Sequence, residues 1–91
     1  MASTDKSLRV VIVTPEKAVL DDKAEFIVLP MVDGELGVLP AHAPFIGRLG
    51  KGELRITHAG VIQKWQVSGG FAQVRSNVVT VLTSKAAAET A

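Results

Sequence analysis

The sequence of 91 residues contains no cysteine and no tyrosine, and its only aromatic residues are three phenylalanines and one tryptophan. Without cysteine, the chain forms no disulfide and has no thiolate chemistry. A nucleic-acid-binding surface needs a basic face or aromatic stacking platforms, and a formal net charge of +1 with 4% aromatic residues supplies neither. We therefore expect no nucleic-acid partner.

Long apolar runs and metal-binding motifs are also absent. No run approaches the roughly 20 apolar residues that a transmembrane helix requires, and no signal-peptide cleavage site follows the short apolar run near the N-terminus. The two histidines, His42 and His58, are far apart and fit no zinc or calcium motif. These features predict a chain without a membrane span, a cofactor or a bound metal, and one that faces the cytosol.

Hydrophobic residues make up 47% of the chain, which is rich for one small domain. Short runs of valine, isoleucine and threonine recur about every ten residues, separated by glycine, proline or asparagine. The connections are too short for crossover helices, so the pattern predicts an all-β fold, a two-sheet antiparallel β-sandwich. The expected strands are 8–14, 25–29, 45–49, 53–57, 61–68, 71–75 and 77–83.

The expected organisation is a flexible N-terminus at 1–7, a β-sandwich domain at 8–84 and a short C-terminal tail at 85–91. The runs 10–13 and 26–29 are apolar on both faces, whereas a sandwich strand buries only one face in the core. The other faces then need cover, either from the segment 31–44 folded back over one of these strands or from another protein. We expect one sheet face to carry an apolar patch of roughly several hundred Å².

The segment 31–44 reads MVDGELGVLPAHAP and places Asp33, Glu35 and His42 near one another in the sequence. If His42 worked with Asp33 or Glu35, the chain would be a small ligand-binding or hydrolytic β-sandwich, and this alternative stays open. A histidine between two alanines in a loop is more often packed or bonded to backbone than catalytic. The glycines and prolines predict a fixed, irregular backbone.

Other candidate motifs lack the context that their chemistry requires. At 47–52, Gly50 and Lys51 are followed by glycine rather than by the serine or threonine of a phosphate-binding loop, and a turn after a strand explains the three glycines. The Ser-Gly-Gly sequence at 68–70 lacks the surroundings of a nucleophile elbow, and a hairpin or bulge explains it. Trp65 alternates in phase with Val67, which predicts burial rather than an exposed carbohydrate platform. By elimination, the residues predict a protein that works by contact.

Four stretches follow one another in a characteristic order and spacing: GELGVLPAHAP (34–44), GELRI (52–56), VSGGFAQV (67–74) and NVVTVLT (77–83). In these stretches the chain resembles the epsilon subunit of the rotary F-type ATP synthase, which is termed delta in mitochondria. A shorter stretch, TPEKAVLDD (14–22), resembles the family's loop after the first strand. The resemblance runs from about residue 8 to residue 85.

The resemblance implies a β-sandwich that catalyses nothing itself and needs no cofactor. Family members lie at the foot of the central stalk, between the gamma subunit and the membrane c ring, and help couple ion flow to ATP synthesis. By resemblance, Asp33 and Glu35 are candidate contacts of the c ring, and His42 and Pro44 of the gamma subunit. The implied location is peripheral, on the cytoplasmic side of the bacterial inner membrane or the equivalent face of another energy-transducing membrane.

Two further expectations follow from the resemblance. Typical members continue into a C-terminal helical hairpin that restrains ATP hydrolysis, and this sequence stops at Ala91, where the hairpin would begin. We therefore expect the chain to lack hairpin-based inhibition. Within the segment 31–44, the apolar side chains should point inward and the two carboxylates outward. The inward residues are then Leu36, Val38 and Leu39.

Overall fold

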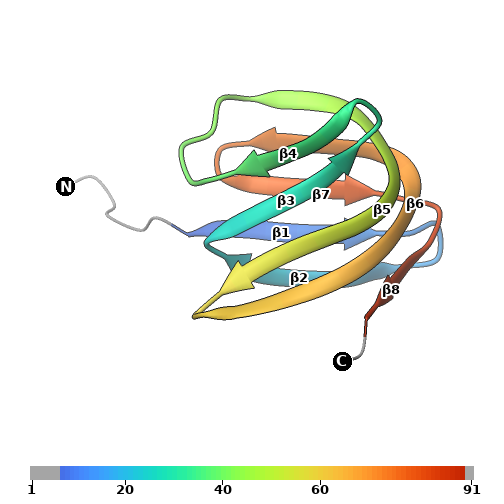
Figure 1. The fold of residues 1–91 in the computed structure, drawn as a ribbon, viewed down its shortest axis with the longest axis horizontal. Coiled ribbons are helices and arrows are strands. Elements are labelled where there is room, and N and C mark those ends of the chain that lie inside the picture. The colour runs from blue at the N-terminus through green and yellow to red at the C-terminus, as the bar shows by residue number, and fades with distance from the viewer. Residues whose placement is uncertain (1–6, 90–91) are drawn as a thin grey trace.

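The structure is a computed structural model that describes residues 7–89. The expected flexible N-terminus at 1–7 therefore lies, except for Ser7, outside the described residues. Every regular element between residues 7 and 89 is a β-strand, which confirms the predicted all-β class (Figure 1). The strands are β1 (Leu8–Val13), β2 (Ala18–Ala24), β3 (Phe26–Met31), β4 (Gly34–Val38), β5 (Phe45–His58), β6 (Val61–Arg75), β7 (Val78–Leu82) and β8 (Ala86–Ala88).

The sandwich is one continuous sheet folded on itself. Hydrogen bonds connect the strands in the order β2-β1-β7-β6-β5-β3-β4, and β8 pairs with β6. Strands β5 and β6 pair from end to end and curve together from one layer into the other (Figure 1). Layer 1 is the layer of β1, β2 and β7, and layer 2 is the layer of β3, β4 and β8. Each layer is completed by one half of β5 and one half of β6.

Strands β5 and β6 replace four separate strands that the sequence predicts. The runs 45–49 and 53–57 join into β5, and the runs 61–68 and 71–75 join into β6. The glycines between these runs do not end the strands, because the antiparallel pairing resumes directly beyond them. The predicted turn at 47–52 and the predicted hairpin or bulge at 68–70 are therefore wrong, because the β5–β6 register continues unshifted and the glycines lie where the sheet bends.

Close approach of backbone explains why glycine occupies the bend. Gly70 has a φ of 114°, and a Cβ there would lie 1.8 Å from the carbonyl oxygen of Leu82. A Cβ on Gly50 would lie 3.2 Å from the carbonyl oxygens of Pro30 and Met31. Gly70 therefore leaves no room for a side chain between β6 and β7, and a Cβ on Gly50 would require the carbonyl groups of β3 to shift by a few tenths of an ångström.

One strand pair differs from the predicted antiparallel arrangement. Strand β1 pairs with β7 in parallel, with Arg9 opposite Val78 and Val13 opposite Leu82. Parallel neighbours need a long connection rather than a tight turn. The chain meets this requirement without a helix, because strands β2 to β6 lie between β1 and β7 in the sequence.

Three strands lie in segments for which the sequence predicts none. Strand β2 follows the turn after β1, and β8 lies in the expected tail. Strand β4 lies within 31–44, where two glycines in five residues give a low intrinsic strand propensity. Pairing with β3 and burial of Val38 compensate for that low propensity. Because β4 lies beside β3, it does not fold over the outer face of β3, as the sequence had suggested it could.

The outer face of β3 is covered at Val28 by side chains of its own layer, whereas Phe26 at the start of the strand is 36% exposed. Val28 is directly opposite Gly37 on β4 and Arg55 on β5. Arg55 reaches across β3 to Glu35 on β4, which leaves Val28 only 7% exposed. This contact explains how a strand that is apolar on both faces remains at the surface of the sandwich.

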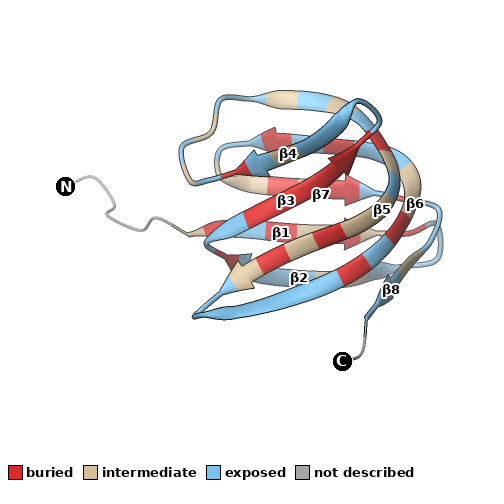
Figure 2. Cartoon of the chain, in the orientation of Figure 1, coloured by how far each residue is buried: buried red, intermediate tan, exposed pale blue. Residues whose placement is uncertain are grey.

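The core lies between the two layers and takes alternate residues from them (Figure 2). Leu54 and Ile56 are buried, as their alternation with polar residues predicts, and Trp65 is also buried. Burial of Trp65 confirms that it forms no exposed aromatic platform. The fully buried large side chains are Leu8, Val10, Ile12, Ile27, Leu29, Val38, Leu54, Val67, Val74, Val79 and Val81.

Candidate functional site

The two predicted contact carboxylates lie on the β3–β4 hairpin. Asp33 is at its tip and Glu35 is on β4, and both are exposed, as predicted. Beside Asp33, Val32 is 63% exposed and donates its backbone N–H to the carbonyl of Arg48 at 3.1 Å. The hydrogen bond ties the hairpin tip to β5, so Asp33 projects from an anchored turn.

Glu35 is part of an ion-pair network. Its two carboxylate oxygens accept hydrogen bonds from Nη1 and Nη2 of Arg55 at 3.1 and 3.2 Å. Arg55 also donates to Glu53 at 3.3 Å. The hydrogen bonds to Glu35, and then those to Glu53, raise the pKa of Arg55. The negative charge of the exposed Glu35 carboxylate is therefore partly balanced by the positive charge of Arg55.

The 39–44 loop leaves β4 through a tight turn. The N–H of His42 donates to the carbonyl of Leu39 at 3.1 Å, with Pro40 as the second residue of the turn. Ala41, the third residue, has a φ of 69°, a conformation that glycine or asparagine normally supplies at this position. Its N–H donates to Oδ1 of Asn77 at 2.7 Å.

Two of the three apolar side chains expected to point inward do so. Val38 is fully buried, and Leu36 packs against the core while half-buried. Leu39 is 58% exposed, so its predicted inward orientation is wrong. The turn that begins at Leu39 carries the chain away from the core before Phe45 enters β5.

His42 lies in this loop, half-buried, and Pro44 is exposed. Nδ1 of His42 is 2.7 Å from the carbonyl oxygen of Ala43. Because a carbonyl only accepts, Nδ1 carries the proton of this bond. A backbone-bonded loop histidine is what the sequence favours over a catalytic one.

The structure does not bring His42 together with the two carboxylates. Asp33 precedes β4 and His42 follows it, and a five-residue strand spans about 16 Å. No hydrogen bond or ion pair among residues 7–89 joins His42 to Asp33 or Glu35. In the same residues, no group of three or more His, Asp or Glu side chains could hold a metal ion. The arrangement therefore offers contact surfaces at the two ends of β4.

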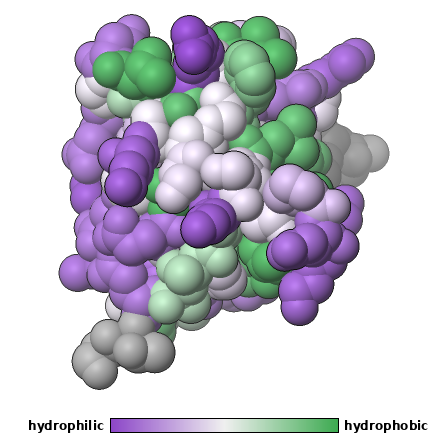
Figure 3. All heavy atoms as spheres, turned by 90° about the vertical axis from the view of Figure 1, so that its right-hand side faces the viewer, coloured by the Kyte–Doolittle hydropathy of each residue, from purple (hydrophilic) through white to green (hydrophobic). Residues whose placement is uncertain are grey.

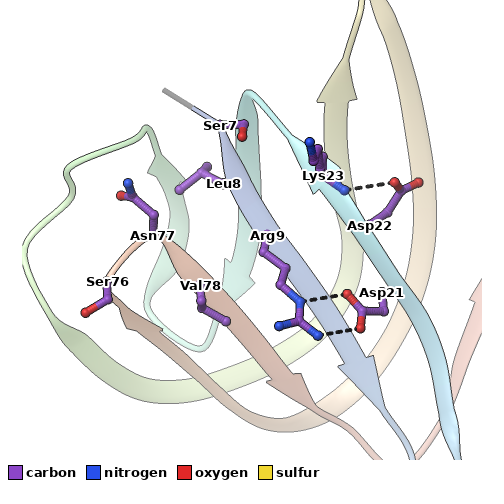
Figure 4. Close-up of a pocket in the computed structure, with 9 residues that line it drawn as sticks. All are labelled: Ser7, Leu8, Arg9, Asp21, Asp22, Lys23, Ser76, Asn77 and Val78. Carbon is purple, nitrogen blue, oxygen red and sulfur yellow. Dashed lines mark hydrogen bonds and ion pairs between the residues drawn. The ribbon is translucent and has the colours of Figure 1, made fainter. Parts of the chain in front are cut away.

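An open hollow of about 640 Å³ borders the start of β1, the end of β2 and the start of β7 (Figure 4). On its wall, Arg9 donates from Nε and Nη2 to the two carboxylate oxygens of Asp21, at 2.8 and 2.6 Å. The hydrogen bond from Arg9 lowers the pKa of Asp21. Lys23 and Asp22 also line the hollow, so it contains two cations and two carboxylates. This balance of charge favours neither an anionic nor a cationic ligand.

The outer face of layer 1 carries exposed apolar side chains that the sequence analysis did not single out. Phe71 is 51% exposed and lies opposite Leu82, which is 50% exposed, and opposite Arg48. Directly opposite residues share a face, and Ile46, 68% exposed, shares that face two residues before Arg48. The sequence does contain a signal for this face: Phe71 is adjacent to Ala72, which is buried, so Phe71 must point outward.

These residues form the layer 1 apolar face, defined as Ile46, Phe71, Leu82 and the half-buried Val13, which lies opposite Leu82. An open hollow of about 410 Å³ adjoins it beyond the end of β1. The end of the molecule where β5 and β6 bend is different, because Figure 3 shows polar residues there with apolar residues only in separate spots. Ile46, Phe71 and Leu82 therefore share one sheet face, whereas the exposed apolar side chains of Val32, Leu39, Val61 and Ile62 lie in or beside turns and loops.

Comparison with known proteins identifies the family. The family described as the ATP synthase, Delta/Epsilon chain, beta-sandwich domain matches residues 7–89. The chain belongs to this family. As a delta/epsilon β-sandwich domain, it has the fold that the sequence resemblance implies. No helix among its described residues is long and apolar enough to cross a membrane.

Relatives of this delta/epsilon domain are longer than the chain. It is 54% identical to the ATP synthase epsilon chain of Rhodopirellula baltica over 88% of its own length and 62% of that relative. It is 48% identical to the ATP synthase epsilon chain of Pelotomaculum thermopropionicum, over 91% of its own length and 62% of that relative. The chain thus spans about three fifths of the length of these relatives.

Solved structures with the same fold come from larger assemblies. A chain of the Euglena gracilis mitochondrial ATP synthase, solved as OSCP/F1/c-ring, is 24% identical with a TM-score of 0.88, covering 96% of this chain and 56% of that one. A chain of the Tetrahymena thermophila mitochondrial ATP synthase central stalk/c-ring is 19% identical with a TM-score of 0.72, covering 87% and 64%. At these identities the likeness shows the fold alone.

Proposed function

We propose that the chain is a non-catalytic rotor subunit in the central stalk of an F-type ATP synthase. In this role it links the gamma subunit to the membrane c ring and helps couple ion flow to ATP synthesis. The observation that carries the proposal is the family match over residues 7–89, together with 54% identity to a protein named ATP synthase epsilon chain. The fold likeness to chains of ATP synthase stalk and c-ring structures supports it.

The two ends of β4 supply candidate contacts for two different partners. Asp33 and Glu35 are exposed on an anchored hairpin, which suits contact with the polar loops of the c ring. Pro44 is exposed and His42 half-exposed in the 39–44 loop, which suits contact with the gamma subunit. Asp33 precedes β4 and the 39–44 loop follows this strand of about 16 Å, so contacts at its two ends leave room for two partners.

The layer 1 apolar face supports the expectation of a protein partner. Three large apolar side chains that are each at least half exposed share one sheet face, with Arg48 beside them. Clustered apolar exposure bordered by arginine is typical of protein interfaces. In the assembled complex the domain would be peripheral to the membrane, on the face that carries the catalytic head and, in a bacterium, on the cytoplasmic side.

Co-purification with the gamma subunit and the c ring of the same organism tests the proposal. We expect a stoichiometric complex with the gamma subunit that also docks on the c ring. The chain should first be shown to be folded by far-ultraviolet circular dichroism. A folded chain that binds neither partner would overturn the proposal.

Charge reversal of Glu35 tests the hairpin contact. Glu35→Lys should weaken docking on the c ring without unfolding the domain, because exposed ion pairs contribute little to stability. The matched control is Arg55→Gln, which removes the same ion pair but keeps the charge of Glu35. Retained docking by the control is expected. Equal weakening by both variants, or unfolding of Glu35→Lys, would instead make Glu35 a structural residue.

A further inference from the structure

Asn77 lies at the junction of three segments that are far apart in the sequence. Ser76 and Asn77 form the two-residue turn between β6 and β7, with φ values of 51° and 63°. Two successive positive φ values mark the hairpin turn that fits the twist of adjacent strands. Asparagine tolerates this conformation better than most residues, as glycine also does.

The side chain of Asn77 accepts a hydrogen bond from the 39–44 loop, and the geometry of the turn does not require this bond. Its Oδ1 accepts the N–H of Ala41 at 2.7 Å, while its backbone carbonyl accepts the N–H of Arg9 at 2.8 Å. Figure 4 shows the amide of Asn77 directed from the turn toward the pale green loop between β4 and β5, and away from the Arg9–Asp21 pair. Glycine would satisfy the backbone of the turn equally well but would lack the acceptor.

The 39–44 loop depends on this acceptor. Pro40 and Pro44 have no N–H, and the N–H of His42 is used inside the loop by the carbonyl of Leu39. Among the hydrogen bonds of residues 7–89, the bond from Ala41 to Asn77 is the one that joins this loop to another part of the fold. Ala41 also holds an unfavourable positive φ of 69°, which needs support from its surroundings.

We infer that Asn77 is a positioning residue for partner binding by the 39–44 loop. Its amide oxygen fixes the turn at Ala41 and so presents His42 and Pro44 in the conformation that the partner meets. A preformed loop binds more tightly than a mobile one, because less conformational entropy is lost on association. The inference rests on the proposed contact with the gamma subunit.

The test compares Asn77→Gly with Asn77→Asp. The glycine variant keeps a residue suited to the positive φ and removes the acceptor, whereas the aspartate variant keeps both. Ser76→Gly is the matched control, because it changes the same turn and leaves Asn77 in place. Three quantities are measured: the free energy of unfolding, the hydrogen-exchange rate of the Ala41 amide by NMR, and the affinity for the gamma subunit by calorimetry.

For Asn77→Gly we expect the Ala41 amide to exchange at least about tenfold faster than in the wild type, because it loses its acceptor. Affinity for the gamma subunit should fall by roughly five- to tenfold, the cost of ordering a freed loop. Exchange of core amides in β7 should stay unchanged. Asn77→Asp and Ser76→Gly should behave like the wild type in both exchange and affinity.

Each contrary result overturns a definite part of the inference. Unchanged exchange of Ala41 in Asn77→Gly would mean that the side chain does not hold the loop. Faster exchange with wild-type affinity would mean that the held conformation is irrelevant to binding. Loss of affinity in Ser76→Gly as well would assign the effect to the turn rather than to the acceptor. If the wild-type chain itself fails to bind the gamma subunit, the proposed function fails, and the exchange data still decide whether Asn77 positions the loop.

Discussion

Gly70 shows how strongly one backbone position can constrain this fold. It lies in β6 where the strand bends between the two layers, and its φ of 114° is unfavourable for any residue with a side chain. The carbonyl of Leu82 on β7 occupies the space that a Cβ would need. Gly60, in the β5–β6 turn, also has a positive φ, of 78°, but a Cβ there would meet nothing within 4 Å.

Gly70→Ala should therefore destabilise the domain far more than Gly60→Ala. The Gly60 variant introduces only the backbone penalty of a positive φ, about 1–2 kcal/mol. The Gly70 variant adds a backbone clash that no side-chain rotation relieves, so we expect a loss of about 3 kcal/mol or more. Urea unfolding of the two variants measures both losses. Equal losses would show that the bend yields without cost and that the close approach to β7 is unimportant.

At the scale of the strands, ion pairs on the exposed faces link one strand to another within each layer. Arg9 on β1 binds Asp21 on β2, the edge strand of layer 1, through two hydrogen bonds. Arg55 makes the corresponding link in layer 2, across β3 to Glu35. Both pairs are at the surface, so their contributions depend on salt and on pH.

The Arg9–Asp21 pair predicts a pH dependence of stability. The hydrogen bond from Arg9 lowers the pKa of Asp21 in the folded protein below its value of about 4 in the unfolded chain. A lowered pKa means that the contribution is complete above about pH 4 and is lost as the pH falls through the folded-state pKa. The stability difference between wild type and Asp21→Asn should accordingly be constant from about pH 5 to 7 and shrink below about pH 4.

A double-mutant cycle separates this pair from other titrating groups. Arg9→Gln should reproduce the effect of Asp21→Asn, and the double variant should lose little more than either single variant. Urea unfolding of all four proteins at neutral and acidic pH gives the coupling free energy. A coupling that persists well below the folded-state pKa of Asp21, or that is absent at pH 7, would contradict the assignment.

At the scale of the whole molecule, the two layers share their longest strands. Strands β5 and β6 run through both layers, and the buried side chains of both layers form one core. Neither layer could unfold without freeing one half of β5 and β6 and exposing the core residues of the other layer. The fold therefore has the character of a single cooperative unit.

Cooperativity predicts that two probes of unfolding will coincide. Trp65, the only tryptophan, is 9% exposed in the part of β6 that pairs with β8 in layer 2, so its fluorescence reports that layer. Far-ultraviolet circular dichroism reports the strands of both layers. We expect the same urea midpoint from both signals. A fluorescence transition that precedes the loss of circular dichroism would show that layer 2 unfolds separately.

Several properties of the domain follow from residues that are close in the sequence. Alternation of Leu54 and Ile56 with polar neighbours predicts which side chains are buried, because adjacent residues of a strand always face opposite sides. The short connections predict an all-β fold, and the exposure of Asp33 and Glu35 follows from a polar hairpin with glycine. These features require no knowledge of which strands become neighbours.

Other properties depend on which distant residues meet. Gly50 and Gly70 mark a bend rather than turns because β3 and β7 lie against them, and the parallel pairing of β1 with β7 depends on the strands β2 to β6 that lie between them in the sequence. Likewise, Arg55 reaches Glu35 only because β3 lies between β5 and β4. Ala41 and Asn77 are 36 residues apart in the sequence, and only the fold brings them together. The sequence by itself determined the class of fold, the inward faces and the family. Only the tertiary structure decided the bend, the ion pairs and the support of the 39–44 loop, because these depend on strand register and close packing between segments that the sequence separates.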